Sequence, residues 1–160
     1  HHSCIIKPLY GNGGKSVFYT TSQDPNLDVI IEKFVDENEH FIIQKFVKNV
    51  SKGDKRILLI DGEPVGAINR VPGKKKIRAN IHIGGKAKKS KITKNDLKIC
   101  SAIKKTLKSR GLFFAGIDII DNHLTEINVT SPTCIREIDY FNKDNIAKKF
   151  WDVFENKYLH

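Results

Sequence analysis

The sequence predicts an α+β fold, with a mixed or antiparallel sheet and flanking helices. Two short turns, at Asp61-Gly62 and at residues 121–123, each join two β-prone runs, which is typical of antiparallel hairpins. Other segments carry apolar residues at helical spacing, and the two kinds of segment follow one another in mixed order. No internal repeat is evident, which excludes a solenoid.

The first part of the chain is predicted to form a hairpin, a helix and a further strand. Residues 4–7 and 16–20 are short β-prone runs on either side of a glycine-rich turn. Asp24-Pro25 supplies an N-cap followed by a proline at the first helical position, and the apolar stripe that follows predicts a helix to about residue 37. Residues 41–47 are mostly apolar and β-prone, so they are predicted to form a strand.

The middle of the chain predicts a second hairpin and then a long loop. Residues 55–60 and 64–69 flank the Asp61-Gly62 turn, which is a favoured hairpin connection. Residues 71–90 are rich in Gly and Lys, have little periodicity and are long for a connection within a compact domain. We therefore predict a functional flexible loop over residues 71–90.

The last part predicts a capped helix, a third hairpin and a terminal helix. Thr93 and Asp96 form an N-terminal capping signal, and Gly111 lies where that helix would end. The remaining predicted elements are strands over residues 112–120 and 124–129 and a helix over residues 142–158.

Composition limits the class of protein. The 160 residues suit one domain, or one lobe with part of another, and 39% hydrophobic residues with 29% charged residues are ordinary for a soluble globular chain. No apolar run approaches the roughly 20 residues of a membrane helix. Three cysteines are too few for a disulfide framework, so a cytoplasmic location is expected. Residues 1–3 resemble the remnant of an expression tag.

The formal net charge of +10 favours polyanionic partners, so a nucleic-acid surface must be weighed beside a nucleotide site. Much of the excess lies in lysines between residues 74 and 94, where no aromatic residue is interleaved for base stacking. A solvated, mobile loop explains this run better than a nucleic-acid interface does.

A glycine-rich loop begins at Lys7 and includes Gly11, Gly13 and Gly14. Glycines allow a backbone to approach phosphates and to direct N–H groups at them. The loop is not a Walker A motif, because Leu9 stands where the first glycine would be and strand-prone residues follow the loop. A glycine-rich hairpin without a ligand remains the alternative at this point.

Two carboxylates and an amide are predicted to meet on the last hairpin. Glu126 and Asn128 alternate onto one face of their strand, and pairing through the short turn can bring Asp118 beside them. Such oxygen ligands suit Mg²⁺ or Mn²⁺. The alternative is that Asp118 and Glu126 are solvent-facing residues of a half-exposed hairpin, although their apolar neighbours indicate a largely buried sheet.

Arginines in or beside predicted loops form a third candidate group. They are Arg56, Arg70, Arg78 and Arg136, with Lys55 adjacent to the first. Arginine binds phosphates and carboxylates through a planar fork, so a common placement would create an anion site. Taken one at a time, each is more typical of a surface salt bridge.

Four stretches taken together resemble the bacterial glutathione synthetases. They are Lys7-Pro8-Leu9 with the following glycines, Gly53-Asp54-Lys55-Arg56, Asp61-Gly62-Glu63-Pro64, and the run LTEINVTSPTCIRE over residues 124–137. The last is the most specific, and the similarity runs in order over almost the whole chain. The resemblance implies a partial ATP-grasp fold, with residues 4–47 in the central subdomain and residues 48–160 in the C-terminal catalytic subdomain.

The resemblance also implies an activity, which is the ATP-dependent ligation of γ-glutamylcysteine and glycine through an acyl phosphate. ATP and Mg²⁺ or Mn²⁺, as two ions, would be the cofactors. An N-terminal domain is expected to precede this chain, which begins abruptly, so the isolated fragment is expected to be inactive. A membrane partner is not expected, and a homo-oligomer of the full-length enzyme stays open. The alternatives are another ATP-grasp ligase, such as a ribosomal-protein glutamate ligase, and a basic nucleic-acid-binding module.

Residue roles follow from the same resemblance. The residues expected to bind nucleotide are Lys7, Gly11, Gly13, Gly14, Gln44, Lys45, Phe46, Val47 and, at the ribose, Asp54. Those expected to act on the transferring phosphoryl group and the closing loop are Arg56, Arg70, Arg78 and Asn80. The metal ligands would be Asp118, Glu126 and Asn128, and the peptide substrate would contact Ser131, Pro132, Thr133 and Cys134.

Overall fold

The computed structural model describes residues 3–11, 13–73 and 85–159. It divides into two compact units, His1–Lys48 and Asn49–His160. The sequence-based boundary between residues 47 and 48 falls next to this division. No helix within the described ranges is long and apolar enough to span a membrane.

The first unit is a small antiparallel sheet covered by one helix. Its elements are β1 (Ser3–Pro8), β2 (Phe18–Thr21), α1 (Leu27–Asp36) and β3 (Phe41–Lys45), and the strand order is β2-β1-β3. The predicted hairpin is confirmed, because β1 and β2 pair antiparallel. Phe34 of α1 is fully buried, and its ring lies 6.1 Å from that of Phe18 and 5.0 Å from that of Phe41.

The predicted start of α1 differs slightly from the structure. Asn26, not Asp24, is the N-cap residue, and it makes no side-chain cap bond. Asp24 instead accepts hydrogen bonds from the Asn26 backbone N–H at 2.9 Å and from the Thr20 hydroxyl at 3.1 Å. The aspartate therefore organises the turn before the helix.

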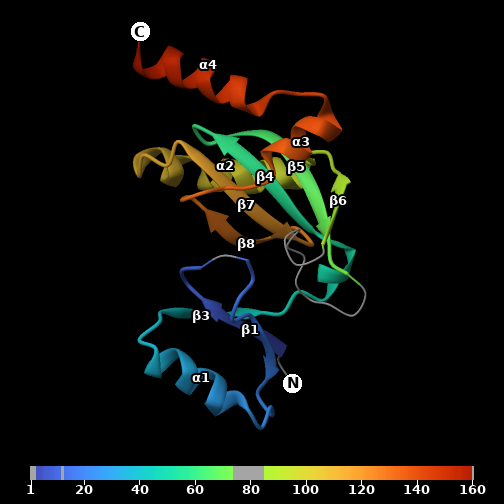
Figure 1. Cartoon of the computed structure of the whole chain (residues 1–160), viewed down its shortest axis with the longest axis vertical. Helices are drawn as coiled ribbons and strands as arrows, with labels where there is room; N and C mark the ends of the chain where they lie inside the picture. Colours follow the sequence, from blue (N-terminus) through green and yellow to red (C-terminus); the bar gives the residue numbers. More distant parts are fainter. Residues whose placement is uncertain (1–2, 12, 74–84, 160) are drawn as a thin grey trace. The chain divides into compact units, whose positions relative to one another are not determined.

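The second unit is a five-stranded sheet with helices on both faces (Figure 1). Its elements are the 3-10 helix η1 (Lys48–Lys52), which begins at the division, then β4 (Asp54–Ile60), β5 (Glu63–Val71), β6 (Lys86–Lys89), α2 (Lys94–Ser109), β7 (Phe114–Ile120), β8 (His123–Asn128), α3 (Ile135–Asn142) and α4 (Ile146–Tyr158). The order is β6-β5-β4-β7-β8, and each neighbouring pair is antiparallel. The predicted α+β class is confirmed.

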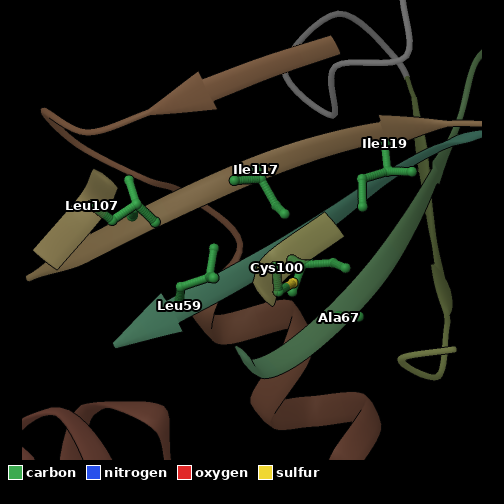
Figure 2. Close-up of a cluster of buried hydrophobic side chains, with 8 residues drawn as sticks. Leu59, Ala67, Cys100, Leu107, Ile117 and Ile119 are labelled. Atoms are coloured by element: carbon green, nitrogen blue, oxygen red, sulfur yellow. The ribbon is translucent and has the colours of Figure 1, made fainter. Parts of the chain in front are cut away.

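Alternation along the strands gives each face of this sheet its own apolar cluster. On one face, residues of β4, β5 and β7 such as Leu59 and Ile117 pack against Cys100 and Leu107 of α2 (Figure 2). On the other face, the buried residues are Leu58, Ile60 and Ile68 of the strands, Cys134, Ile138 of α3 and Ile146 of α4. Burial of both faces explains why these strands are so rich in Ile and Leu.

Two elements depart from the sequence-based prediction. The predicted loop over residues 71–90 contains β6, which pairs antiparallel with the end of β5. Helix α3 lies in a stretch for which no helix was predicted, and α4 begins at Ile146 rather than at residue 142. The rest of the predicted loop, residues 74–84, lies outside the described residues.

The capping signal of α2 is confirmed and extends into an ion pair. The Thr93 hydroxyl accepts from the Asp96 N–H, and the Asp96 carboxylate accepts from the Thr93 N–H at 2.8 Å. Lys55 of β4 donates to the same carboxylate at 2.7 Å. Burial by itself raises the pKa of Asp96, but the hydrogen bonds from Lys55 and Thr93 outweigh it and hold the pKa below its usual range. One buried carboxylate therefore ties α2 to the central strand.

Replacing this carboxylate by an amide, Asp96→Asn, is expected to lower the free energy of unfolding by about 1–3 kcal/mol at pH 7. Because the pKa of Asp96 is lower when folded, its contribution is present above the unfolded pKa, near ~3.9, and is lost as the pH falls through the folded value. Urea unfolding should therefore separate wild type from variant at pH 7 and bring them together once the pH lies below the folded pKa of Asp96. The control is Asp152→Asn, which breaks an exposed pair with Lys148. Equal losses in the two variants would contradict the prediction.

Candidate functional site

Four charged side chains are buried side by side in the second unit. They are Asp54 and Arg56 of β4, Arg70 of β5 and Asp118 of β7. These side chains project from the same face of the sheet as Leu58 and Ile68. On that face, the charged residues lie next to the apolar cluster that packs against α3. We refer to these four residues as the Asp–Arg cluster.

Arginines surround Asp118. Arg56 donates to it from both Nε and Nη2, the second bond being 2.9 Å long. Arg70 Nη2 lies 2.9 Å from Asp118 Oδ2. The same Nη2 lies 2.6 Å from Asp54 Oδ2, and Arg70 Nε lies 3.5 Å from the Asp54 carbonyl oxygen. Two arginines are thus shared by two buried carboxylates.

The β4–β5 hairpin and the β7–β8 hairpin each contain a bulge, and these bulges bring the site residues onto one face of the sheet. After the Asp61-Gly62 turn, Leu59 opposes Pro64, but Leu58 opposes Gly66, so Val65 is the extra residue. The shift places Arg70 opposite Asp54. An unbroken ladder would pair Asp54 with Asn69 and turn Arg70 to the other face of the sheet, because side chains alternate.

The β7–β8 hairpin also contains a bulge of one residue. Ile119 opposes Leu124, but Asp118 opposes Glu126, so Thr125 is the extra residue. The Thr125 hydroxyl donates to the Asp118 carbonyl oxygen at 3.1 Å, which fixes the irregularity. Without it, Asp118 would face Thr125, and Glu126 would project from the opposite face.

The predicted metal ligands therefore share one face of the sheet. Asp118 is directly opposite Glu126, and Gly116 is directly opposite Asn128, two residues further along each strand. Glu126 is exposed, whereas Asp118 is buried. Asn128 Nδ2 donates to the Gly116 carbonyl oxygen at 3.5 Å, which leaves the amide oxygen of Asn128 to act as a ligand. The site residues stay a prediction.

The donor set fits a hard divalent cation. Carboxylate and amide oxygens are the ligands that Mg²⁺ and Mn²⁺ prefer. In addition, Asp54 Oδ1 is buried and has no hydrogen-bond partner among the described residues. No group of three His, Cys, Asp or Glu residues able to hold a metal occurs in the described part of the chain, so any ion here depends on Asn128, solvent or a bound phosphate to complete its ligands.

The electrostatics of the cluster are consistent with a need for further positive charge. Burial, and then the charge of Asp118, raise the pKa of Asp54 to about 7 despite the nearby arginines. Burial alone would also raise the pKa of Asp118, but the charge of Arg70 and hydrogen bonds from Arg56 keep it below its usual range. Glu126 adds a third carboxylate within electrostatic range of Asp54. Two carboxylates thus share two arginines while a third carboxylate lies within electrostatic range, and a bound cation would offset the additional negative charge.

The predicted substrate loop lies against the same cluster. Cys134 is buried and has a positive φ of 85°, just before α3 begins. Burial raises the pKa of its thiol, so the thiol stays protonated and is unsuited to act as a nucleophile. A side chain at Gly116 would place its Cβ 3.0 Å from Pro132 Cβ and 3.2 Å from Arg56 Cδ. Gly116 therefore lets the loop and the arginine approach the strand.

The sequence pattern around Asp118 includes Gly116, but no role was predicted for this glycine. Its signal was available, because a glycine inside an otherwise apolar strand often marks a close approach of another segment. Nor did sequence reasoning pair Asp54 with Arg70, since that pairing depends on the bulge. Arg136 is exposed, and Ser131 and Thr133 are exposed as well.

The predicted nucleotide residues of the first unit form a loop and a strand edge. Gly13 and Gly14 have φ values of 69° and 70°, a left-handed conformation that favours glycine. Lys7 lies in β1 opposite Ile42 of β3. Four other residues expected to bind nucleotide fall on β3 and just after it, as Gln44, Lys45, Phe46 and Val47. Two of the predicted catalytic residues, Arg78 and Asn80, lie outside the described residues.

A family model described as "Prokaryotic glutathione synthetase, ATP-grasp domain" matches residues 1–143. Among curated proteins, the glutathione synthetase of Brucella melitensis is 53% identical over 94% of this chain and 49% of its own length. That of Mesorhizobium japonicum is 50% identical over 96% of this chain and 49% of its own length. The chain thus spans about half the length of these curated relatives.

Solved structures share the fold at low sequence identity. The D-cycloserine synthetase DcsG has a TM-score of 0.65 at 16% identity, covering 82% of this chain and 48% of its own. The D-alanine–D-alanine ligase from Bacillus anthracis complexed with ATP has a TM-score of 0.64 at 14% identity, covering 91% of this chain and 49% of its own. Together with the family model, this likeness establishes a partial ATP-grasp fold for the chain.

Proposed function

Because this chain belongs to the prokaryotic glutathione synthetase ATP-grasp domain family, we propose that the whole protein joins γ-glutamylcysteine to glycine with ATP. The reaction would proceed through an acyl phosphate on the cysteinyl carboxylate. The observation that carries the proposal is the buried Asp–Arg cluster, placed beside Glu126 and against the predicted substrate loop. Such a site offers charge neutralisation and positioning, which are what phosphoryl transfer chiefly requires.

We assign nucleotide-binding roles to residues within each unit separately. Lys7 and the backbone N–H groups of the glycine loop would bind phosphates, and residues 44–47 would bind the adenine. Asp54 would reach the ribose through Oδ1, the oxygen that accepts no hydrogen bond from the described residues. In this assignment residues 4–47 belong to the central subdomain and residues 48–160 to the catalytic subdomain.

The arginines and oxygen ligands of the second unit would handle the reacting groups. Arg56 and Arg70 would stabilise the transferring phosphoryl group and the acyl phosphate. Asp118, Glu126 and Asn128 would hold Mg²⁺ or Mn²⁺, as two ions. When bound, the cations would neutralise phosphate oxygens. Arginines that already contact Asp118 in the folded chain are preorganised for this task.

The remaining assignments concern the substrate and its surroundings. The peptide would contact Ser131, Pro132, Thr133 and Cys134 through short side chains and backbone groups. Arg78 and Asn80, within the predicted loop, would help to exclude water, which would otherwise hydrolyse the acyl phosphate. We propose that the reaction takes place in the cytoplasm. A homo-oligomer of the whole protein is compatible with these assignments.

The test is ADP release by the whole protein in a coupled assay. We expect turnover with γ-glutamylcysteine plus glycine and Mg²⁺, and at most weak turnover when another dipeptide or another amino acid replaces either substrate. Mass spectrometry should identify glutathione as the product. Faster turnover with glutamate and a protein acceptor would instead favour an ATP-grasp ligase that modifies proteins, and no ADP release with any pair would refute the proposal.

A further inference from the structure

Arg70 contacts two carboxylates, and the one on the neighbouring strand β4 belongs to Asp54. Asp54 and Arg70 are cross-strand partners, and Arg70 Nη2 lies 2.6 Å from Asp54 Oδ2. The side chain of Arg70 is 5% exposed and that of Asp54 is 12% exposed, so water competes little for this pair. Arg70 Nε also faces the Asp54 carbonyl oxygen at 3.5 Å. Both contacts hold the guanidinium at the start of β4.

The carboxylate of Asp118 supports Arg70 in a different way from Asp54, because it also accepts from Arg56. Arg56 already donates to both of its oxygens, and Arg70 reaches only Oδ2, with the same Nη2 that contacts Asp54. With the amide of Asn at position 54, the charge that remains beside Arg70 would be that of Asp118, and Arg70 would be drawn toward it. Its guanidinium would then rotate on a side chain that has several rotatable bonds.

We infer that Asp54 is a positioning residue, whose Oδ2 fixes the guanidinium of Arg70 over Asp118, in addition to any contact that its Oδ1 makes with the nucleotide. One carboxylate thereby links the nucleotide pocket to an arginine of the reacting centre. The inference rests on the proposed function for the role of Arg70, while the pairing itself rests only on the fold. A displacement of about 1 Å in such a group can cost roughly 100-fold in rate.

The experiment is a double-mutant cycle in the whole protein with Asp54→Asn, Arg70→Lys and the double variant. Asp54→Asn keeps the shape of the side chain and removes its charge, and Arg70→Lys keeps the charge and removes the fork. We expect Asp54→Asn to lower kcat at least tenfold in wild type and less than threefold in the Arg70→Lys background. The KM for ATP should change less than kcat. Equal losses of kcat in both backgrounds would overturn the inference.

Deoxynucleotides distinguish a role of Asp54 in positioning Arg70 from a role of Asp54 in binding the ribose. If Asp54 positions Arg70, the loss of kcat should be the same with ATP, 2′-deoxy-ATP and 3′-deoxy-ATP. If its whole role is to bind the ribose, Asp54→Asn should raise the KM for ATP toward those of the deoxynucleotides and leave kcat unchanged, which would refute positioning. The control is Asp96→Asn, which breaks a buried ion pair with Lys55 and should leave kcat unchanged.

The pairing of Asp54 with Arg70 can also be tested by protein stability, without an activity measurement. If the wild-type protein makes no glutathione, the proposed function fails, and the same cycle is measured by urea unfolding. A coupling of tenfold in the folding equilibrium, about 1.4 kcal/mol, supports the pairing. Additive effects of the two substitutions on unfolding overturn it.

Discussion

Replacing Arg56 with methionine is expected to destabilise the second unit by about 3–5 kcal/mol, because it leaves a buried carboxylate with half of its support. Asp118 is 4% exposed and receives two of its hydrogen bonds from Arg56. Methionine fills most of the space but donates nothing. Urea unfolding of the chain at pH 7 measures the loss, and ligase activity of the whole protein should be lost with it.

The size of this loss should depend on pH. Hydrogen bonds from Arg56 help to keep the pKa of Asp118 below its usual range, so the stabilisation is complete above the unfolded pKa, near ~3.9. It disappears as the pH falls through the lower folded value. The difference between wild type and Arg56→Met should therefore shrink under strongly acidic conditions.

Two further variants make the Arg56 prediction specific. Arg110→Met makes the same chemical change at an exposed position and should alter the unfolding free energy by less than about 0.5 kcal/mol. Arg56→Met combined with Asp118→Leu should recover part of the stability, because removing both members of a buried pair costs less than removing one. A single Arg56→Met variant as stable as Arg110→Met would show that the pair contributes nothing.

Local signals predicted most of the fold. The Asp61-Gly62 turn lies between β4 and β5, and Asp61 and Gly62 have φ values of 48° and 78°, as a type I′ hairpin turn requires. The capping signal of Thr93 and Asp96 is at the N-terminus of α2. These features involve residues within a few positions of each other, so the sequence contains all the information that determines them.

The shape of the site depends on information that no local pattern contains. A two-residue turn predicts an unbroken ladder, in which Asp118 would face Thr125, and Arg70 would leave the face of Asp54. Each bulge shifts the register by one residue. The contact of Arg56 with Asp118 needs a further non-local step, since β4 pairs with β7 across a separation of about 60 residues. The sequence could therefore identify these residues as candidates for the site, but it could not predict which of them contact one another.

The two missed elements have different causes. Helix α3 has apolar residues at helical spacing, Ile135, Ile138 and Phe141, but it is only 8 residues long, and its first residues belong to the run 124–137 that resembles a ligand-binding segment. Strand β6 is mostly lysine, which is depleted in strands, and only pairing with the exposed edge of β5 makes it a strand. In β6, tertiary context overrides local preference.

The second large effect is expected at Glu126, where Glu126→Gln in the whole protein should reduce ATP-dependent glutathione formation by more than about 100-fold. The substitution keeps the size of the side chain and removes one negative charge opposite Asp118. Glu126 is exposed, so the change should leave the unfolding free energy nearly unaltered, in contrast to Arg56→Met. A large loss of activity with unchanged stability indicates a role in ligand binding rather than in folding.

A cation titration distinguishes a ligand from a general surface charge. If Glu126 binds the cations, Glu126→Gln should raise the Mg²⁺ concentration that gives half-maximal activity. The fraction of activity that Mn²⁺ restores should differ from the fraction that Mg²⁺ restores, because the two ions have different ligand preferences. Glu155→Gln, at an exposed position of α4, removes the same charge away from the sheet and should behave as wild type. Near-normal turnover of Glu126→Gln at saturating Mg²⁺ would exclude Glu126 as an essential ligand, and Asp118 would then have to bind the cation while it remains paired with two arginines.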